Sequence, residues 1–183
     1  MALAYDAIRP RFDQIKDYIV SDLDRVIEQT DGGNYIAAAL ITCACDALST
    51  LKYGGENRGD RFFKELLPTT WQPVAKPLYE AIRNGLVHTY DTRLICIGEQ
   101  EIEVVISWGR KPHLRLSDDG RQLYINVKNL SRDFKSALNR LEADLREHPS
   151  LRDTFADSIR RWRKQQIPRQ QVAKWQQLLW PNR

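Results

Sequence analysis

Apolar residues recur at steps of three and four along the first part of the chain, with charged residues between them. This spacing predicts an amphipathic helix with one solvated face. A second helix, expected at about Tyr35 to Lys52, is apolar nearly all round and should be the most buried one. A shorter helix is expected from Asp60 to Leu67, and another follows Pro73. The apolar stripe of the first helix consists of Phe12, Ile15, Ile19, Leu23, Val26 and Ile27.

After Thr92 the apolar residues alternate with polar ones, which is the period of a half-buried strand. Two such runs surround a turn at Gly98-Glu99-Gln100, and two more surround Asp119-Gly120, a strong hairpin signal. The pattern predicts four strands in two hairpins, forming a small antiparallel meander over residues 93–128. The alternating residues are Ile95, Ile97, Ile102, Val104, Ile106, Leu114, Leu116, Leu123, Ile125 and Val127.

The helical period returns for the rest of the chain, with Ser131 as the expected cap of the next helix. We expect C-terminal helices over residues 131–183. The fold class is therefore mainly α (α+β), in a single domain over residues 1–183, because no stretch is long or polar enough to act as a linker. The apolar stripes are Phe134, Leu138, Leu141 and Leu145, then Leu151, Phe155, Ile159 and Trp162, then Val172, Trp175, Leu178 and Leu179.

The composition is that of a soluble globular protein, with 42% hydrophobic and 28% charged residues. The net charge of +4 permits an anionic partner but does not require one. The N-terminal stretch carries acids early and does not look like a signal peptide, and Asp46 interrupts the most apolar run. We therefore expect a cytoplasmic protein. The three cysteines are interpreted as small buried hydrophobes, and neither a zinc site nor another cofactor is expected.

The stretch IRNGLVHTY, from Ile82 to Tyr90, places three polar side chains within six residues of one expected helix. At about 100° per residue, Arg83, Asn84 and His88 project away from the stripe that faces the core. Asn84 and His88 are four residues apart, which is close enough to share one hydrogen-bonding site. Gly85 would allow close approach of a second helix. Such a face meets solvent, a ligand or a second subunit.

The RNGLVH stretch resembles the R-x(4–6)-H signature of HEPN domains (higher eukaryotes and prokaryotes nucleotide-binding), including a polar residue directly after the Arg. The resemblance covers residues 4–92 and implies an up-down helical bundle, to which the strands and the C-terminal helices are additions. It implies a metal-independent endoribonuclease of toxin–antitoxin or anti-phage type, whose site lies across a homodimer. The residues carried over are Arg83, Asn84 and His88, with Asp46 as the acidic residue expected on the second helix.

The residue types fit this chemistry. RNA can be cut by its own 2′-hydroxyl, so that neither a protein nucleophile nor a metal is needed. Imidazole can donate or accept a proton near neutral pH, and a guanidinium offers a fixed fork of donors to phosphate oxygens. Asn84 would orient the phosphate or His88. Each chain offers one good titrating group at this face, and a two-fold dimer would supply the second.

A non-catalytic HEPN-like module for binding or dimerisation is the alternative, with His88 acting only through the helix dipole. An antitoxin or a nucleotidyltransferase-like protein is a further partner that the resemblance implies. A second candidate site is the basic run Arg160, Arg161, Arg163 and Lys164. Trp162 within it could stack on RNA bases, but its place in an apolar stripe favours the core. His113 and His148 are given no role.

Overall fold

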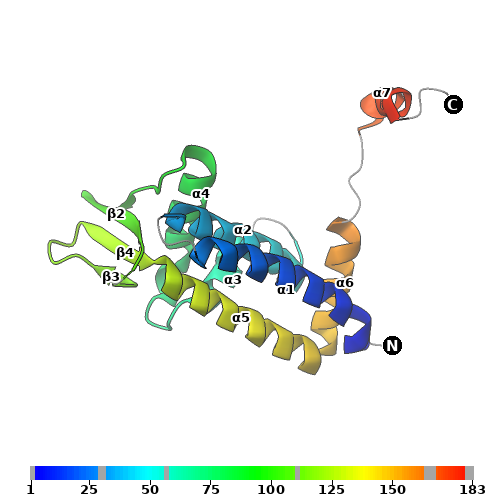
Figure 1. Cartoon of the computed structure of the whole chain (residues 1–183), viewed down its shortest axis with the longest axis horizontal. Coiled ribbons are helices and arrows are strands. Elements are labelled where there is room, and N and C mark those ends of the chain that lie inside the picture. Colours follow the sequence, from blue (N-terminus) through cyan, green and yellow to red (C-terminus); the bar gives the residue numbers. More distant parts are fainter. Residues whose placement is uncertain (1–2, 29–31, 56–57, 110–111, 163–167, 180–183) are drawn as a thin grey trace.

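The computed structural model describes residues 3–28, 32–55, 58–109, 112–162 and 168–179. Within these ranges the chain is mainly helical, with a small mixed sheet at one end of the bundle (Figure 1). The elements in chain order are α1 (Tyr5–Glu28), α2 (Asn34–Tyr53), α3 (Gly59–Leu66), a 3₁₀ turn (Gln72–Val74), α4 (Ala75–Thr89), β1 (Ile95–Ile97), β2 (Gln100–Ser107), β3 (Arg115–Leu116), β4 (Gln122–Asn126), α5 (Val127–Glu147), α6 (Pro149–Trp162) and α7 (Arg169–Leu179).

Helix α2 is the centre of the bundle, as the sequence predicts, since α1, α3, α4, α5 and α6 all pack against it. Ile41, Cys45 and Leu48 on its inner side are fully buried. Helix α2 is nevertheless not covered on every side, because Ile36 and Cys43 on its outer side are exposed. This exposed side also carries Asp46, so the helix has one uncovered strip.

Helix α2 is long and apolar enough, by length and composition, to cross a membrane. Half of its most apolar window is nevertheless buried inside the protein, as in the core helix of a soluble domain. The structure is thus consistent with a soluble protein. The cytoplasmic location stays a prediction.

The sheet has the strand order β1-β2-β4-β3. Both predicted hairpins form, since β1 pairs with β2 and β3 with β4 in antiparallel fashion. The all-antiparallel meander is wrong, however, because β2 and β4 pair in parallel. The physical reason is burial: the parallel pairing brings Val104 and Ile106 of β2 beside Leu123 and Ile125 of β4, all buried, and leaves the short β3 at the edge.

The start of α5 also differs from the prediction. Asn126, at the end of β4, caps this helix by accepting hydrogen bonds from the backbone N–H groups of Lys128 and Asn129. Ser131, the expected cap, is buried one turn inside the helix. The strand therefore passes into the helix without a loop, which holds the sheet against the bundle.

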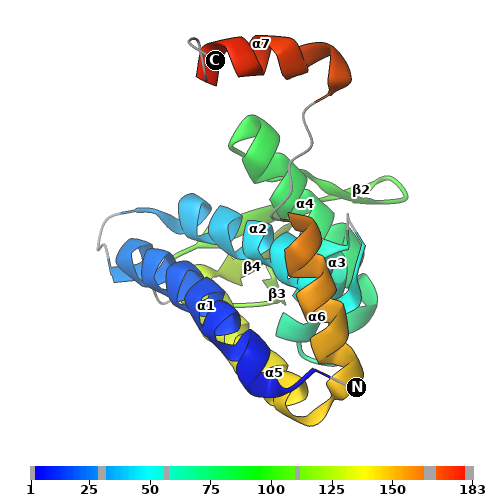
Figure 2. The ribbon, with the colours of Figure 1, turned by 90° about the vertical axis from the view of Figure 1, so that its right-hand side faces the viewer.

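Helix α6 packs beside the C-terminal half of α2. The Ser158 hydroxyl donates to the Thr50 carbonyl at 3.0 Å, and Phe155 is fully buried against Phe12 of α1. Helix α7 differs from the others because none of its residues is buried. It stands apart from the rest of the ribbon in both views (Figures 1 and 2).

Candidate functional site

The outer face of α4 carries the three residues singled out by the sequence. Arg83 and Asn84 are half-buried, whereas His88 is exposed near the C-terminal end of the helix. Leu78, Tyr79, Ile82 and Leu86 form the buried side, as the helical angles predict, but Tyr90, which the same angles place on that side, is 64% exposed. Within the described ranges, the His88 imidazole has no hydrogen-bond or ion-pair partner.

Asp46 joins α2 to this face of α4. Its Oδ2 accepts a hydrogen bond from Arg83 Nε at 3.1 Å, and its Oδ1 accepts one from the Tyr79 hydroxyl at 2.6 Å. The Asp46 and Arg83 side chains are each 32% exposed, so the pair is partly shielded from water but open on one side. The structure thus brings Asp46 together with Arg83, as the sequence suggested, and Tyr79 lies in the same network.

Asp46 fixes the direction of the Arg83 guanidinium. Burial lowers the pKa of Arg83, but the hydrogen bond and the charge of Asp46 more than offset it and raise that pKa above its ordinary value. Arg83 Nη1 donates to Asn84 Oδ1 at 3.2 Å, and Nη2 has no partner within the described residues. The arrangement keeps Arg83 charged, and it leaves one edge of the guanidinium able to bind an anion.

Tyr79 and Gly59 complete this network, and sequence reasoning missed both as site residues. A Cβ on Gly59, at the start of α3, would lie 2.2 Å from Tyr79 Oη and 2.3 Å from Asp46 Oδ1. Burial, followed by the hydrogen bond to Asp46, raises the pKa of Tyr79, so its hydroxyl stays protonated and donates. In the sequence, the position of Tyr79 four residues before Arg83 could have indicated this contact. Because Tyr79 also lies in the apolar stripe, it was read as a core residue.

Removing the Tyr79 hydroxyl tests this network. We expect Tyr79→Phe to lower the free energy of unfolding by about 1 kcal/mol, because Asp46 loses one buried donor. Urea denaturation measures the change. The matched control is Tyr18→Phe on α1, whose 63% exposed ring should give a change within about 0.5 kcal/mol. Equal stabilities of Tyr79→Phe and wild type would contradict the structural role of this hydrogen bond.

Gly85 does allow a close backbone approach, but not by a second helix as the sequence suggested. A Cβ there would lie 2.2 Å from the Asp91 carbonyl oxygen and 2.8 Å from Thr92 Cα. The segment after α4 folds back against this glycine, and the Arg93 N–H donates to the Ala81 carbonyl at 3.0 Å. Gly85 therefore sets the path from the motif helix into the sheet.

The cysteines correct another expectation. Cys45 is fully buried, but Cys43 and Cys96 are exposed. Cys43 lies one turn before Asp46 on the uncovered side of α2, and burial raises the pKa of its thiol. In the part of the chain that the structure describes, no three His, Cys, Asp or Glu side chains are placed to hold a metal ion.

The basic run lies at the end of α6. Arg160 and Arg161 are exposed, and Arg160 pairs with Asp157 one turn earlier. The interpretation of Trp162 as a core residue is wrong, because its side chain is 48% exposed. Arg163 and Lys164 lie outside the described residues. The structure thus leaves a tryptophan open to solvent beside cationic side chains.

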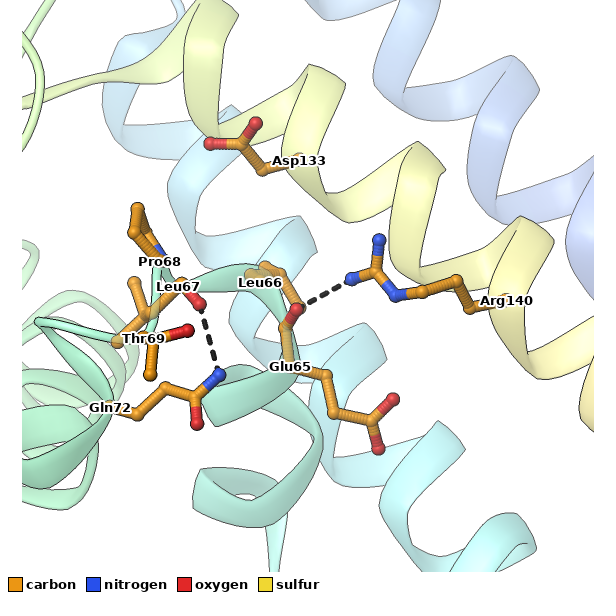
Figure 3. Close-up of a pocket in the computed structure, with 8 residues that line it drawn as sticks. All are labelled: Glu65, Leu66, Leu67, Pro68, Thr69, Gln72, Asp133 and Arg140. Carbon is orange, nitrogen blue, oxygen red and sulfur yellow. Dashed lines mark hydrogen bonds between the residues drawn. The ribbon is translucent and has the colours of Figure 1, made fainter.

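A hollow of about 470 Å³ lies elsewhere, between α3, the following turn and α5 (Figure 3). Two of its polar side chains are already engaged: Arg140 donates to the Glu65 carbonyl at 2.6 Å, and Gln72 donates to the Leu67 carbonyl at 3.3 Å. Asp133, also on its wall, lies 3.3 Å from His113 Nε2. None of the predicted site residues lines this hollow, and its groups serve the packing of α3 against α5.

Comparison with known proteins gives no relative: no family model, no curated protein and no solved structure matches the chain.

Proposed function

We propose that this chain is a metal-independent endoribonuclease of HEPN type that acts as a homodimer. The observation that carries the proposal is the pairing of Arg83 with Asp46, which holds a charged guanidinium on the outer side of α4. His88 on the same side is exposed and has no partner among the described residues. A fixed cation and a mobile proton carrier are the two groups that RNA cleavage requires from a protein.

In the proposed reaction the RNA 2′-hydroxyl oxygen attacks the adjacent phosphorus, and the bond from phosphorus to the 5′-oxygen breaks. A base takes the proton of the 2′-hydroxyl, and an acid gives a proton to the leaving 5′-oxygen. The products are a 2′,3′-cyclic phosphate and a 5′-hydroxyl. Arg83 stabilises the negative charge that develops on the phosphate, Asn84 supports Arg83 through its side-chain carbonyl, and His88 transfers the protons. Asp46 acts through Arg83 rather than on the RNA.

A second copy is needed for geometric reasons. Arg83 and His88 are five residues apart, so they project about 140° from one another and are offset by about 7.5 Å along the helix axis. One α4 helix therefore does not aim both groups at the same phosphate. Two α4 helices related by a two-fold axis would place the His88 of one copy opposite the Arg83 of the other.

The uncovered sides of α2 and α4 suit such a dimer. Val87 on α4, one turn after Arg83, and Ile36 on α2, ten residues before Asp46, are each 45% exposed. Exposed large apolar side chains near a polar cluster are typical of a surface that a partner covers. The same surface would enclose the reacting phosphate and exclude water from it.

Cleavage in a chelator tests the proposal. Purified protein with a mixed RNA pool and excess EDTA should yield fragments that end in a 2′,3′-cyclic phosphate, identified by mass spectrometry. Arg83→Ala should lower the rate by about 10²–10³-fold, the usual effect of losing one charge-stabilising group. Arg25→Ala, an exposed arginine on α1, is the matched control and should cleave at the wild-type rate. RNA left intact by the wild-type protein would overturn the proposal.

The Asp46–Tyr79–Arg83 network also favours one alternative, a non-catalytic binding or dimerisation module. The network ties α2 to α4, which is a sufficient structural reason for its residues. On this alternative Arg83→Ala lowers stability, RNA is bound without turnover, and His88 has no special sensitivity. Side-by-side measurement of unfolding and cleavage for Arg83→Ala and His88→Ala separates the two functions.

A further inference from the structure

The charges of this chain are divided unevenly along the sequence. The last 26 residues, from Ser158 onward, hold seven Lys and Arg residues and no acid, which gives them a formal charge of +7. The first 157 residues hold the other 21 cations and all 24 acids, so that their formal charge is −3. The modest net charge of the whole chain therefore conceals a strongly basic segment, which is typical of a polyanion partner.

The described part of this segment presents its cations and aromatic rings to solvent. Arg161 and Trp162 at the end of α6 are exposed, as are Arg169, Lys174 and Trp175 of α7. Among the described residues, the one hydrogen bond of the Arg161 side chain is donated by Nη2 to the Ser158 hydroxyl at 3.4 Å. Because α7 itself has no acidic residue and no buried residue, its charges are not neutralised by its own helix.

The segment starts from a fixed point close to the proposed site. Ser158 and Phe155 hold α6 against α2, and Arg161 Nη2 lies beside Gly54, which ends α2. Gly54 follows Asp46 by eight residues, or about 12 Å along the helix axis. A nucleic-acid strand bound at the end of α6 would therefore lie about two helical turns from the Asp46–Arg83 pair.

From these observations we infer that the end of α6 (residues 158–162) and α7 form a binding site for single-stranded RNA, separate from the Arg83–His88 face. The choice of RNA as the ligand rests on the proposed function. The cations bind phosphates, and the exposed rings of Trp162 and Trp175 stack on bases, a combination that binds single strands without sequence preference. The segment captures the substrate and raises its concentration at the dimer groove.

An anionic membrane is the competing partner, because α7 also has an apolar stripe. Val172, Trp175 and Leu179 lie within an arc of about 60° on one side of the helix. The opposite side, however, carries only two cations beside two glutamines, an alanine and a leucine, whereas helices that lie in a membrane interface are rich in Lys and Arg there. The cations at the end of α6 also lie on a helix fixed in the protein body. Both features favour RNA.

Binding of a fluorescein-labelled uridine oligonucleotide, followed by fluorescence anisotropy, tests the inference. The His88→Ala protein is used throughout so that the oligonucleotide stays whole. The test variant also carries Arg161→Gln, Arg169→Gln and Lys174→Gln. The matched control instead carries Arg25→Gln, Lys76→Gln and Arg115→Gln, three exposed cations on α1, α4 and β3. Both variants lose three positive charges, so the comparison isolates where those charges lie.

We expect the test variant to bind about 100-fold more weakly at 0.1 M salt, and the slope of log K against log salt to become shallower by about 2. The control should stay within about threefold of the parent protein. Trp162→Ala with Trp175→Ala should weaken binding by at least about fivefold. Equal binding by the two triple variants would overturn the inference. So would binding of the parent protein to vesicles of phosphatidylcholine and phosphatidylserine without binding to RNA.

The RNA-binding test and the cleavage test can fail independently of each other. If wild-type protein cuts no RNA but the triple variant still loses RNA binding, the proposed function fails and the capture site stands. If wild-type protein cuts RNA and the two triple variants bind it equally, the capture site fails and the proposed function stands.

Discussion

We expect His88→Ala to lower the rate of RNA cleavage by about 10²–10⁴-fold, which is the usual contribution of a general acid or base. His88 is exposed and has no protein partner within the described residues, so removing its ring should leave folding intact. The loss should therefore appear in kcat, with the urea midpoint unchanged. Single-turnover cleavage of a labelled RNA in EDTA measures the rate.

The matched control for this prediction is His148→Ala. His148 is also exposed and also lies at a helix C-terminal end, that of α5, but it is far along the chain from the proposed groove. Its removal should leave the cleavage rate unchanged. Similar losses in the two variants, or full activity in His88→Ala, would contradict the role given to His88.

Gly85→Ala should destabilise the protein by about 2 kcal/mol, although the same change within a helix usually stabilises it by about 1 kcal/mol. The new Cβ would lie within 3 Å of three backbone atoms, in Asp91, Thr92 and Arg93. Backbone cannot rotate away as a side chain can, so this segment must shift, at a cost of about 1–3 kcal/mol. The shift also breaks the hydrogen bond from the Arg93 N–H to the Ala81 carbonyl, which contributes about 1 kcal/mol more.

Thermal and urea unfolding measure this effect, with a fall in Tm of about 5 °C. Ser136→Ala on the exposed side of α5 is the control, and we expect a change within about 0.5 kcal/mol there. A Gly85→Ala protein at least as stable as the wild type would show that the segment after α4 does not pack on this glycine.

Much of the fold could be predicted because helices and strands leave different periods in the sequence. The spacing of apolar residues by three and four positions predicted the main helices. Both hairpins form where Gly98 and Gly120 follow runs of alternating apolar and polar residues. The order of strands could not be predicted, because turn signals specify which strands are joined but not which become neighbours. That choice depends on how much apolar surface each arrangement buries, and the buried surface favours β2 beside β4.

The candidate site could be predicted in part for a similar reason. Helical angles placed Arg83 and His88 on the outer side of α4, because that side depends only on local geometry. The hydrogen bond from Tyr79 to Asp46 crosses between helices 33 residues apart in sequence, so periodicity could not reveal it. The exposure of Cys43 and Trp162 was missed because an apolar stripe indicates a buried face only where a neighbour covers it.

A homodimer would explain both the exposed strip of α2 and the need of the proposed reaction for a second titrating group. In the proposed dimer, the partner would cover the exposed strip of α2 and would supply the second imidazole opposite Arg83. A symmetric pair of α2–α4 faces supplies both. The proposed HEPN-type function rests on the RNGLVH motif and on this geometry, and the chemistry of RNA cleavage is its test.

The most direct measurement uses a mixed dimer with one wild-type chain and one His88→Ala chain, purified through two different affinity tags. If each cleavage needs the imidazoles of both copies, the mixed dimer should be slower than the wild-type dimer by about 10²-fold or more. If the mixed dimer retains half of the wild-type rate, one imidazole is enough for each cleavage, and a groove that needs both imidazoles is wrong.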